Sequence, residues 1–270
     1  MRYAYHFEFC ERPEMPEWLR GDLFLSLGFI QDLFGLRRIL DETVPSLVLN
    51  CGAKRVIELG CGSGQGLARV AHALPHLPML ATDVYPHPQL WAEALKGQKA
   101  VTWSERSVGF DDFDQVLSDD LLQGSVLLLM AAFHHAPPAR ARKFLERAAR
   151  CGSSIIIVEP LERTALGVLL GASAALPALV YPIRALVLGH QHGLPARVIA
   201  WLRLAVFHWV IPLIPLILFH DGVVSAFRQR TTPDWLELTQ GLPFTLEARQ
   251  GLGPFRNFSA VLLSNRSGQA

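Results

Sequence analysis

Charged side chains are scarce in this 270-residue sequence: 18% of residues are Asp, Glu, Lys or Arg, where about 25% is usual for soluble domains. The 25 basic and 24 acidic residues nearly cancel, so no overall field would attract nucleic acid, and a nucleic-acid partner is not expected. Hydrophobic residues reach 50%, and the mean hydropathy is +0.25. This length allows one large domain or two small ones with a substantial core.

Cysteine is also scarce. The four cysteines lie far apart, without a Cys-x-x-Cys pair or the Cys/His spacing of a metal module, so neither a disulfide framework nor a metal site is expected. The first 20 residues carry glutamates at positions 8, 11, 14 and 17, where a signal peptide would need an unbroken apolar run. These two absences predict a protein of the reducing cytoplasm.

Short apolar runs alternate with helical patterns along residues 54–159, which is typical of parallel α/β sheets. We predict strands at 54–59, 78–82, 100–103, 124–132 and 154–158, and helices at 65–74, 87–96, 111–122 and 139–150. A helix at 233–240 and an antiparallel pair at 244–252 and 258–264 would complete a mixed sheet of seven strands. The apolar residues before position 50 lack a clean helical stripe, and we expect them to form helices that cap this domain.

The most informative stretch follows the first predicted strand and reads Glu58-Leu59-Gly60-Cys61-Gly62-Ser63-Gly64. Glycines at a strand-to-helix turn let the backbone approach a ligand, and the N-terminus of the helix offers free N–H groups to a negative group. Asp83 ends the next strand, 23 positions after Gly60, where α/β nucleotide sites place a carboxylate for the ribose hydroxyls. The sequence therefore predicts a nucleotide-like ligand at this edge of the sheet.

These residues resemble the first motif of class I S-adenosylmethionine-dependent methyltransferases, E/D-x-G-x-G-x-G, and the resemblance covers about residues 50–160 and 230–265. It implies an α/β, Rossmann-like sheet of six parallel strands and one antiparallel strand with flanking helices, and S-adenosyl-L-methionine as the cofactor. It implies that Gly60, Cys61 and Gly62 lie against the methionine part, that Glu58 supports the turn and the amino group, and that Asp83 holds the ribose. The other cofactor contacts that we expect from it are Gly64, Val84, Val108 and Met130.

Two alternatives for this stretch stay open. The glycines could serve packing alone, or the ligand could be a nicotinamide or flavin nucleotide, although that motif needs a glycine where Gln65 stands. Members of the family often use an acidic residue after the third strand to read the adenine. Here no carboxylate stands at Val108 or Gly109, which leaves Asp111 and Asp112 as the candidates.

The candidate catalytic residues follow the fourth and fifth strands. Phe133-His134-His135 lies at the carboxyl edge, where open α/β sheets bind ligands, and a histidine there could take a proton from an acceptor hydroxyl. The resemblance also allows a structural role, in which this stretch shapes the cofactor pocket. Glu159 either faces the acceptor or pairs with Arg163. We therefore predict His134, His135 and Glu159 as catalytic residues.

A long apolar segment separates the fifth strand from the helix near residue 233. Residues 164–227 contain only four charged side chains: Arg184, Arg197, Arg203 and Asp221. We divide the chain into an N-terminal helical cap (1–50), a methyltransferase domain (51–160 and 228–270) and a hydrophobic, mostly helical insertion (161–227). Asp221 and Arg228 are candidates for closing the pocket or for a structural ion pair.

Two uncharged runs in the insertion, 164–183 and 204–220, approach bilayer-spanning length. The insertion could span the membrane as a helical hairpin, lie in the interface, or form a lid within the protein; its prolines and arginines oppose spanning. All three arrangements imply a lipophilic acceptor. We expect contact with a membrane surface through residues 164–220, and a peripheral or monotopic protein at the inner face of the membrane.

Two further motifs in the insertion carry less weight. His190-Gln191-His192 is interpreted as a surface loop rather than as metal ligands, because no third ligand lies nearby in the sequence. Gly167 and Gly171 form a Gly-x-x-x-Gly pair, which alone does not argue for a dimer, so the oligomeric state stays open.

The sequence thus predicts a methyltransferase that uses S-adenosylmethionine to methylate oxygen or carbon of a small lipophilic acceptor. Two alternatives come from other classes of function. One is a membrane-anchored binding protein without activity, and the other is a different use of the same cofactor, such as cyclisation or aminocarboxypropyl transfer.

Overall fold

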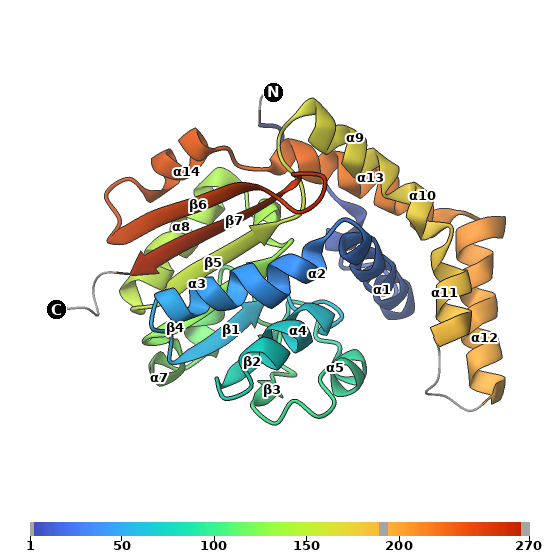
Figure 1. The fold of residues 1–270 in the computed structure, drawn as a ribbon, viewed down its shortest axis with the longest axis horizontal. Coiled ribbons are helices and arrows are strands. Elements are labelled where there is room, and N and C mark those ends of the chain that lie inside the picture. The colour runs from blue at the N-terminus through green and yellow to red at the C-terminus, as the bar shows by residue number, and fades with distance from the viewer. Residues whose placement is uncertain (1–2, 189–193, 266–270) are drawn as a thin grey trace.

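The computed structural model describes residues 3–188 and 194–265, in which seven strands form one sheet beside a group of helices (Figure 1). The strand order is β3-β2-β1-β4-β5-β7-β6, and β7 runs antiparallel to the other six strands. This confirms the predicted sheet of six parallel strands and one antiparallel strand. The strands are β1 Arg55–Leu59, β2 Met79–Thr82, β3 Val101–Trp103, β4 Ser125–Met130, β5 Ser154–Glu159, β6 Phe244–Leu252 and β7 Phe258–Asn265.

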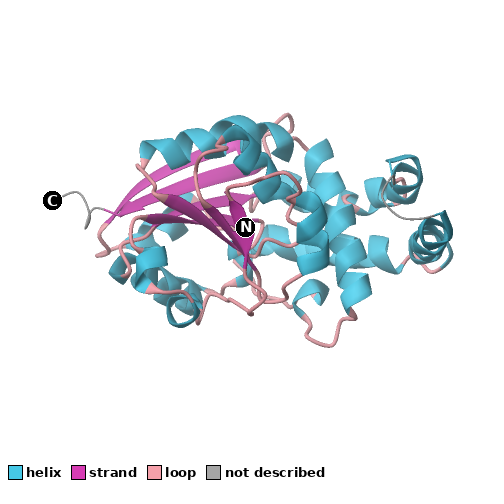
Figure 2. Ribbon diagram, turned by 90° about the horizontal axis from the view of Figure 1, so that it is seen from below, coloured by secondary structure: helices cyan, strands magenta, loops and turns pink. Residues whose placement is uncertain are grey.

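Helices cover both faces of the sheet (Figure 2). One face carries α2 Leu36–Arg38, a π-helical turn Ile39–Thr43, α3 Val44–Asn50, α4 Gln65–Ala73 and α5 Pro88–Ala94. The other carries α6 Phe113–Val116, α7 Asp119–Leu122, α8 Pro138–Arg150 and α14 Thr232–Thr239. The single helix predicted at 111–122 is wrong: Leu117 is extended, and Ser118 followed by two aspartates favours a new helix start.

The unbroken apolar run of the fourth strand results from burial on both faces. Val126 and Leu128 pack with α3 and α4, whereas Leu127 and Leu129 pack with α8 on the opposite face. Alternate side chains of a strand point to opposite faces, so a strand covered on both sides is apolar along most of its length. The polar residue of β4, Ser125, stands at its start, and its hydroxyl donates to the Leu122 carbonyl. This packing fixes the carboxyl end of β4 at the centre of the sheet edge.

The remaining helices form a second layer around α1 Glu17–Leu33 (Figure 1). They are α9 Ala165–Ser173, α10 Ala175–Ala178, α11 Tyr181–Leu188, α12 Leu194–Ala205, a π-helical turn Val206–Val210, and α13 Leu213–Arg228. Leu23 and Ile30 of α1 share a buried cluster with Ala178, Ile214 and Leu218. The insertion therefore packs on the N-terminal helix.

The Gly-x-x-x-Gly pair serves a contact within the chain. A Cβ atom on Gly171 would collide with the carbonyl group of Gly222, and one on Gly222 would collide with the carbonyl group of Gly171. Helices α9 and α13 can pack this closely because both residues lack a side chain. His190-Gln191-His192, interpreted as a surface loop, lies outside the described residues.

Within residues 3–188 and 194–265, no single helix has both the length and the apolar composition needed to cross a bilayer. Two bent pairs reach that length together: Ala165–Ala178 with Tyr181–Val187, bent by 47°, and Val198–Val210 with Leu213–Arg228, bent by 63°. Pro212 lies at the second break, where its ring interrupts the helical hydrogen bonds.

Candidate functional site

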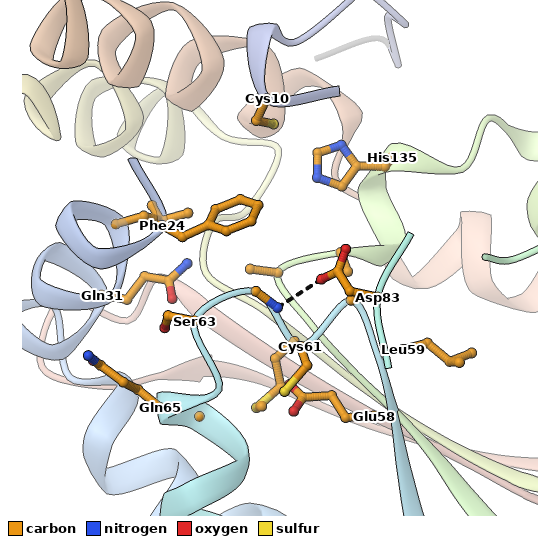
Figure 3. Close-up of a pocket in the computed structure, with 18 of the residues that line it drawn as sticks. Cys10, Phe24, Gln31, Glu58, Leu59, Cys61, Ser63, Gln65, Asp83 and His135 are labelled. Carbon is orange, nitrogen blue, oxygen red and sulfur yellow. Dashed lines mark hydrogen bonds between the residues drawn. The ribbon is translucent and has the colours of Figure 1, made fainter. Parts of the chain in front are cut away.

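A cavity of about 770 Å³ opens at the carboxyl ends of β1, β2 and β4 (Figure 3). Phe24, Leu27 and Gln31 of α1 face these strand ends across the cavity. The predicted cofactor contacts that line it are Glu58, Gly60, Cys61, Gly62, Asp83, Val84, Val108 and Met130. The structure thus brings together, around one space, residues that lie up to 72 positions apart in the sequence.

Gly64 is the predicted contact that the structure places elsewhere. It precedes α4 with a φ of 80°, and a Cβ atom there would lie 2.9 Å from Cδ1 of Trp91. Its neighbour Gly62 also has a left-handed φ, 52°, and its carbonyl accepts a hydrogen bond from Nε1 of Trp91 at 2.9 Å. Gly64 therefore lets the turn pack against α5, while Gly60 and Gly62 present backbone to the cavity.

Asp83 holds the glycine turn from the end of β2. Its Oδ2 accepts a hydrogen bond from the Gly62 N–H at 2.8 Å, and its Oδ1 accepts one from the Tyr85 N–H at 2.9 Å. Burial raises the pKa of Asp83, although these two hydrogen bonds oppose the shift. Each carboxylate oxygen keeps a second lone pair, so Asp83 can hold the turn and still accept from a ligand hydroxyl.

Glu58 brings a buried carboxyl group to the floor of the same cavity. Its Oε2 has no hydrogen-bond partner among the described residues. Burial raises its pKa to about 8; the Cys61 thiol, which hydrogen-bonds to it, opposes the shift, and nearby Asp83 adds to it. An unpaired buried carboxyl oxygen on a cavity wall fits a cationic amino group, and the methionine part of S-adenosylmethionine carries one.

Binding of S-adenosylhomocysteine is expected to strengthen roughly tenfold or more from about pH 6.5 to about pH 8.5, because one pKa unit corresponds to a factor of ten. Below a pKa of about 8 the Glu58 carboxyl is mostly neutral, and an ammonium group prefers its ionised form, so binding must release a proton. Calorimetry in two buffers of different ionisation enthalpy measures that proton. The Glu58→Gln variant should lose the proton release; if it keeps it, another group is responsible.

The two acidic candidates for adenine recognition lie away from the cavity. Asp112 accepts a hydrogen bond from the Gly109 N–H at 2.7 Å, and Asp111 forms an ion pair with Arg140 at 2.7 Å. The wall nearest to them is formed by Val84, Val108 and Phe110. Arg140 also lines the cavity, but these three side chains are apolar and suit the face of a ring system.

An N-terminal strap, residues 3–16, closes one side of the cavity, and sequence reasoning missed it. Tyr5, Cys10 and Glu11 line the cavity, and Glu11 ends the short 3₁₀ turn Phe9–Glu11. Asp221 anchors this turn by accepting hydrogen bonds from the N–H groups of Phe9 (2.9 Å) and Cys10 (3.1 Å). The available signal was the alternation of aromatic residues at positions 3, 5, 7 and 9, a two-residue period typical of extended, half-buried chain.

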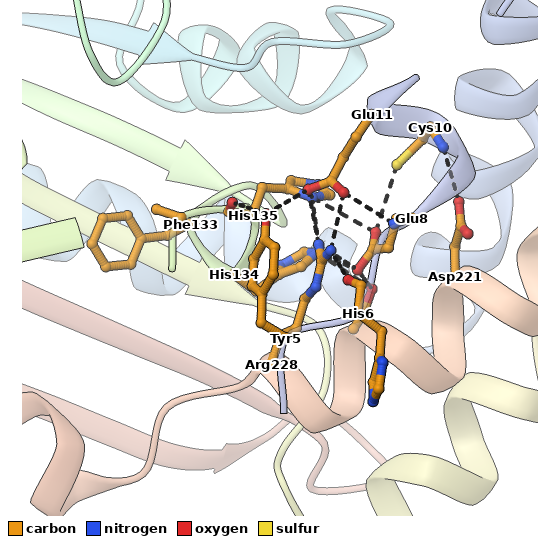
Figure 4. Close-up of polar contacts among 12 residues, drawn as sticks. Tyr5, His6, Glu8, Cys10, Glu11, Phe133, His134, His135, Asp221 and Arg228 are labelled. Carbon is orange, nitrogen blue, oxygen red and sulfur yellow. Dashed lines mark hydrogen bonds and ion pairs between the residues drawn. The ribbon is translucent and has the colours of Figure 1, made fainter. Parts of the chain in front are cut away.

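His134 lies behind the cavity wall, in a buried cluster of charges (Figure 4). Its Nδ1 is 2.7 Å from Oε2 of Glu159, and its Nε2 is 3.7 Å from Oε1 of Glu8. Burial alone would lower the pKa of His134, but the two carboxylates outweigh it and raise the pKa to about 10. A histidine that stays protonated at neutral pH cannot accept a proton, so His134 holds the strap against the sheet.

Of the two alternatives for Glu159, the ion pair with Arg163 is wrong. Glu159 is buried and contacts His134 and Gln229, whereas Arg163 pairs with Asp234 at 2.6 Å. Glu159 thus supports the cluster from the end of β5 and does not line the cavity.

His135 lines the cavity, and the strap holds its ring. Its Nδ1 is 3.0 Å from Oε1 of Glu11 and 3.3 Å from Nη1 of Arg228. The nearer carboxylate favours the tautomer with the proton on Nδ1, which leaves Nε2 to accept a proton. Tyr5 adds a hydrogen bond from its hydroxyl to the His135 carbonyl at 3.1 Å.

Arg228, at the end of α13, forms a structural ion pair, which is one of the two roles predicted for it from the sequence. It is fully buried, donates to both carboxylate oxygens of Glu11 (2.9 and 3.0 Å), and lies 3.2 Å from Glu8. It also donates to the His6 carbonyl and covers the Tyr5 ring, with its Cζ atom 4.1 Å from the ring centroid. Arg228 therefore fixes the strap to the end of the insertion.

Comparison with known proteins agrees with this geometry at the level of fold. No family model and no curated protein sequence matches the chain. Among solved structures, the plantazolicin methyltransferase BpumL, in complex with a triazolic desmethylPZN analog and SAH, is 14% identical with a TM-score of 0.53, over 92% of this chain and 97% of that one. Human N-acetylserotonin methyltransferase in complex with SAM is 13% identical with a TM-score of 0.51, over 89% and 55%.

An O-methyltransferase family protein from Burkholderia thailandensis is 16% identical with a TM-score of 0.51, over 90% of this chain and 60% of that one. The chain thus spans little more than half the length of the human and Burkholderia proteins. The sheet order and these likenesses show that the chain has the fold of class I S-adenosylmethionine-dependent methyltransferases.

Proposed function

We propose that this chain is an S-adenosylmethionine-dependent methyltransferase that methylates a small lipophilic acceptor. One observation carries the proposal: on a class I methyltransferase fold, the unpartnered Glu58 oxygen, the Gly60–Gly62 backbone and Asp83 face one cavity. Glu58 would hold the amino group of the cofactor, the glycine backbone would lie along its methionine part, and Asp83 would hold the ribose. When bound, S-adenosylmethionine supplies a methyl group on a sulfonium, with a neutral leaving group.

The residues of this chain contribute positioning and one proton acceptor. The strap, α1 and the glycine turn would orient the acceptor and exclude water, and in methyl transfer such positioning does most of the work. His135 would take the proton of an acceptor hydroxyl at Nε2, with Glu11 holding Nδ1. This arrangement suits an acceptor that must lose a proton on methylation, such as a hydroxyl.

The lining of the cavity supports a lipophilic acceptor. Phe24, Leu27, Leu36 and Leu40 line it on the side of α1 and the helix that follows, and the aromatic rings of Tyr5, Tyr85 and Phe110 line it elsewhere. Apolar walls with a few placed polar groups are typical of sites for small apolar ligands. The apolar insertion packed on α1 supports presentation of this acceptor at a membrane surface.

Calorimetric titration of S-adenosylmethionine and S-adenosylhomocysteine into the purified protein tests the proposal. We expect both to bind at micromolar levels, and incubation with a lipid extract should then give a product heavier by one methyl group. A folded sample that binds neither ligand would contradict the proposal and favour a binding protein without activity. A product of any other mass would indicate cyclisation or aminocarboxypropyl transfer.

The Asp83→Ala variant is expected to bind S-adenosylhomocysteine at least tenfold more weakly, on the order of the 1.5–3 kcal/mol of hydrogen bonds to a charged group. The variant loses the acceptor for the ribose and releases the N–H groups of Gly62 and Tyr85. Asp120→Ala, an exposed aspartate on α7, is the matched control and should bind as wild type does. Equal affinity of the two variants would mean that the ribose is held elsewhere.

A further inference from the structure

We infer that the insertion carries a bilayer-binding surface, formed by the faces of α9–α13 that do not pack on α1. Among the described residues, 17 of the 27 large hydrophobic side chains that are exposed lie between Leu166 and Phe219. Leu169, Leu176, Ile199 and Val210 are the most open of these, at 65–74% exposure. Soluble proteins rarely expose so many apolar side chains in one region unless a partner covers them.

Two polar side chains of the insertion, Arg203 and His208, point the other way, toward α1. Arg203 donates two hydrogen bonds of 2.8 Å to Asp22, and the buried His208 lies 3.2 Å from the Ser26 hydroxyl. Arg203, one of the arginines that oppose a spanning helix in the sequence, is thus accommodated by an ion pair within the protein. The outward faces are left almost wholly apolar, as in helices that lie in the membrane interface.

The two tryptophans of α12 and of the π-helical turn after it have indole N–H groups that are already hydrogen-bonded within the protein. Nε1 of Trp201 donates to the Pro182 carbonyl at 3.0 Å, and Nε1 of Trp209 donates to the Leu179 carbonyl at 2.8 Å. Trp209 is nevertheless 43% exposed. Because the indole N–H groups already have acceptors, the exposed part of the ring can enter an apolar phase without losing a hydrogen bond.

The charged residues of 164–220 favour a lipid bilayer, rather than a second copy of the chain, as the partner of this surface. Residues 164–220 contain no Asp, Glu or Lys, and their only charged residues are Arg184, Arg197 and Arg203. Arg203 is paired with Asp22 of α1, and a two-fold contact through this segment would bring its arginines together with no acid of the segment between them. An anionic lipid surface complements them, and arginines at an interface can extend to the headgroups.

The bilayer-binding surface adjoins the cavity. Arg184, on α11, lines the cavity, while its neighbours Ile183, Leu186 and Val187 are exposed. Figure 1 shows α11 and α12 side by side at the end of the molecule away from the sheet. If the proposed function holds, a lipophilic acceptor would reach the cavity from the bilayer beside α11; the docking itself does not depend on that function.

Co-sedimentation with vesicles of phosphatidylcholine, with and without phosphatidylglycerol, tests the surface. The triple variant Leu186→Ser, Ile199→Ser, Leu202→Ser removes side chains that are 52%, 69% and 50% exposed on α11 and α12. The matched control is Leu33→Ser, Leu49→Ser, Leu236→Ser, with side chains that are 52%, 66% and 58% exposed outside the insertion. We expect wild type and control to bind vesicles, more tightly with phosphatidylglycerol, and the triple variant to bind at least about tenfold more weakly.

Two results would overturn the inference. One is wild-type protein that stays in the supernatant with both kinds of vesicle. The other is a wild-type dimer in light scattering that the triple variant abolishes while its vesicle binding is unchanged. Calorimetry with S-adenosylhomocysteine on the same samples reports folding and the cofactor site separately, so a failure of the proposed function is distinguishable from a failure of docking.

Discussion

The His135→Gln variant is expected to transfer methyl groups at least about a hundredfold more slowly than wild type, which is the lower end of what a positioned general base contributes. His135 lines the cavity, and Glu11 binds its Nδ1, so Nε2 is the proton acceptor offered to a hydroxyl there. Glutamine preserves much of the volume but cannot accept and retain a proton. Binding of S-adenosylhomocysteine should stay within about threefold of wild type, because Glu58 and Asp83 hold that ligand.

The measurement is transfer of labelled methyl groups from S-adenosylmethionine to an acceptor in a lipid extract, followed across pH. His72→Gln, an exposed histidine on α4, is the control and should retain the wild-type rate. Glu11→Gln should lower the rate and change the pH profile, because Glu11 acts through His135. An unchanged rate in His135→Gln would mean that the acceptor needs no base, as for a carbon or nitrogen nucleophile that is already reactive.

The Arg228→Met variant is expected to lose about 3 kcal/mol of the free energy of unfolding, the lower end of the cost of removing one partner from a buried ion pair. Arg228 is fully buried, and its removal leaves Glu11 and Glu8 without their guanidinium partner. Burial opposes ionisation of Glu8, but His135, His134 and Arg228 outweigh it and lower the pKa of Glu8 to about 2, so the variant removes one partner of a buried, charged carboxylate.

Urea unfolding measures this loss. Arg249→Met removes an arginine that also pairs with a glutamate, Glu247, at 2.8 Å, but at the surface, where about 1 kcal/mol or less is expected. A variant that combines Arg228→Met with Glu8→Gln and Glu11→Gln should be more stable than Arg228→Met alone, because the unpaired charges are gone. Equal losses for Arg228→Met and Arg249→Met would contradict a buried charge cluster.

The sheet and the glycine turn could be predicted because their signals are local. A strand covered on both faces is apolar along most of its length, as at residues 126–130 of β4, and a turn that approaches a ligand needs glycine, as at Gly60 and Gly62. The positions of both follow from a few adjacent residues. Because open α/β sheets bind ligands at the carboxyl ends of their strands, Asp83 at the end of β2 could be predicted to lie near this turn without knowledge of side-chain contacts.

The charge cluster could not be predicted, because its members come from distant parts of the chain. Nothing near Glu159 in the sequence indicates that its partner is His134 rather than Arg163, since that choice depends on where the strap and α13 cross the sheet edge. The same limit affected the two histidines. Their sequence environments are nearly identical, but His134 is buried between two carboxylates that keep it charged, whereas His135 lines the cavity.

The strap contacts a part of the chain that is synthesised much later than the strap itself. Glu11 bonds to Arg228 across 217 positions, and Phe9 bonds to Asp221 across 212. During synthesis β1 to β5 emerge long before residue 228 does, so the parallel sheet and the glycine turn can form first. Closing such a long loop costs conformational entropy that only the completed charge cluster can offset. The cavity wall that holds His135 is therefore completed only after residue 228 has been made, and a chain that stops before Arg228 would carry an open, incomplete site.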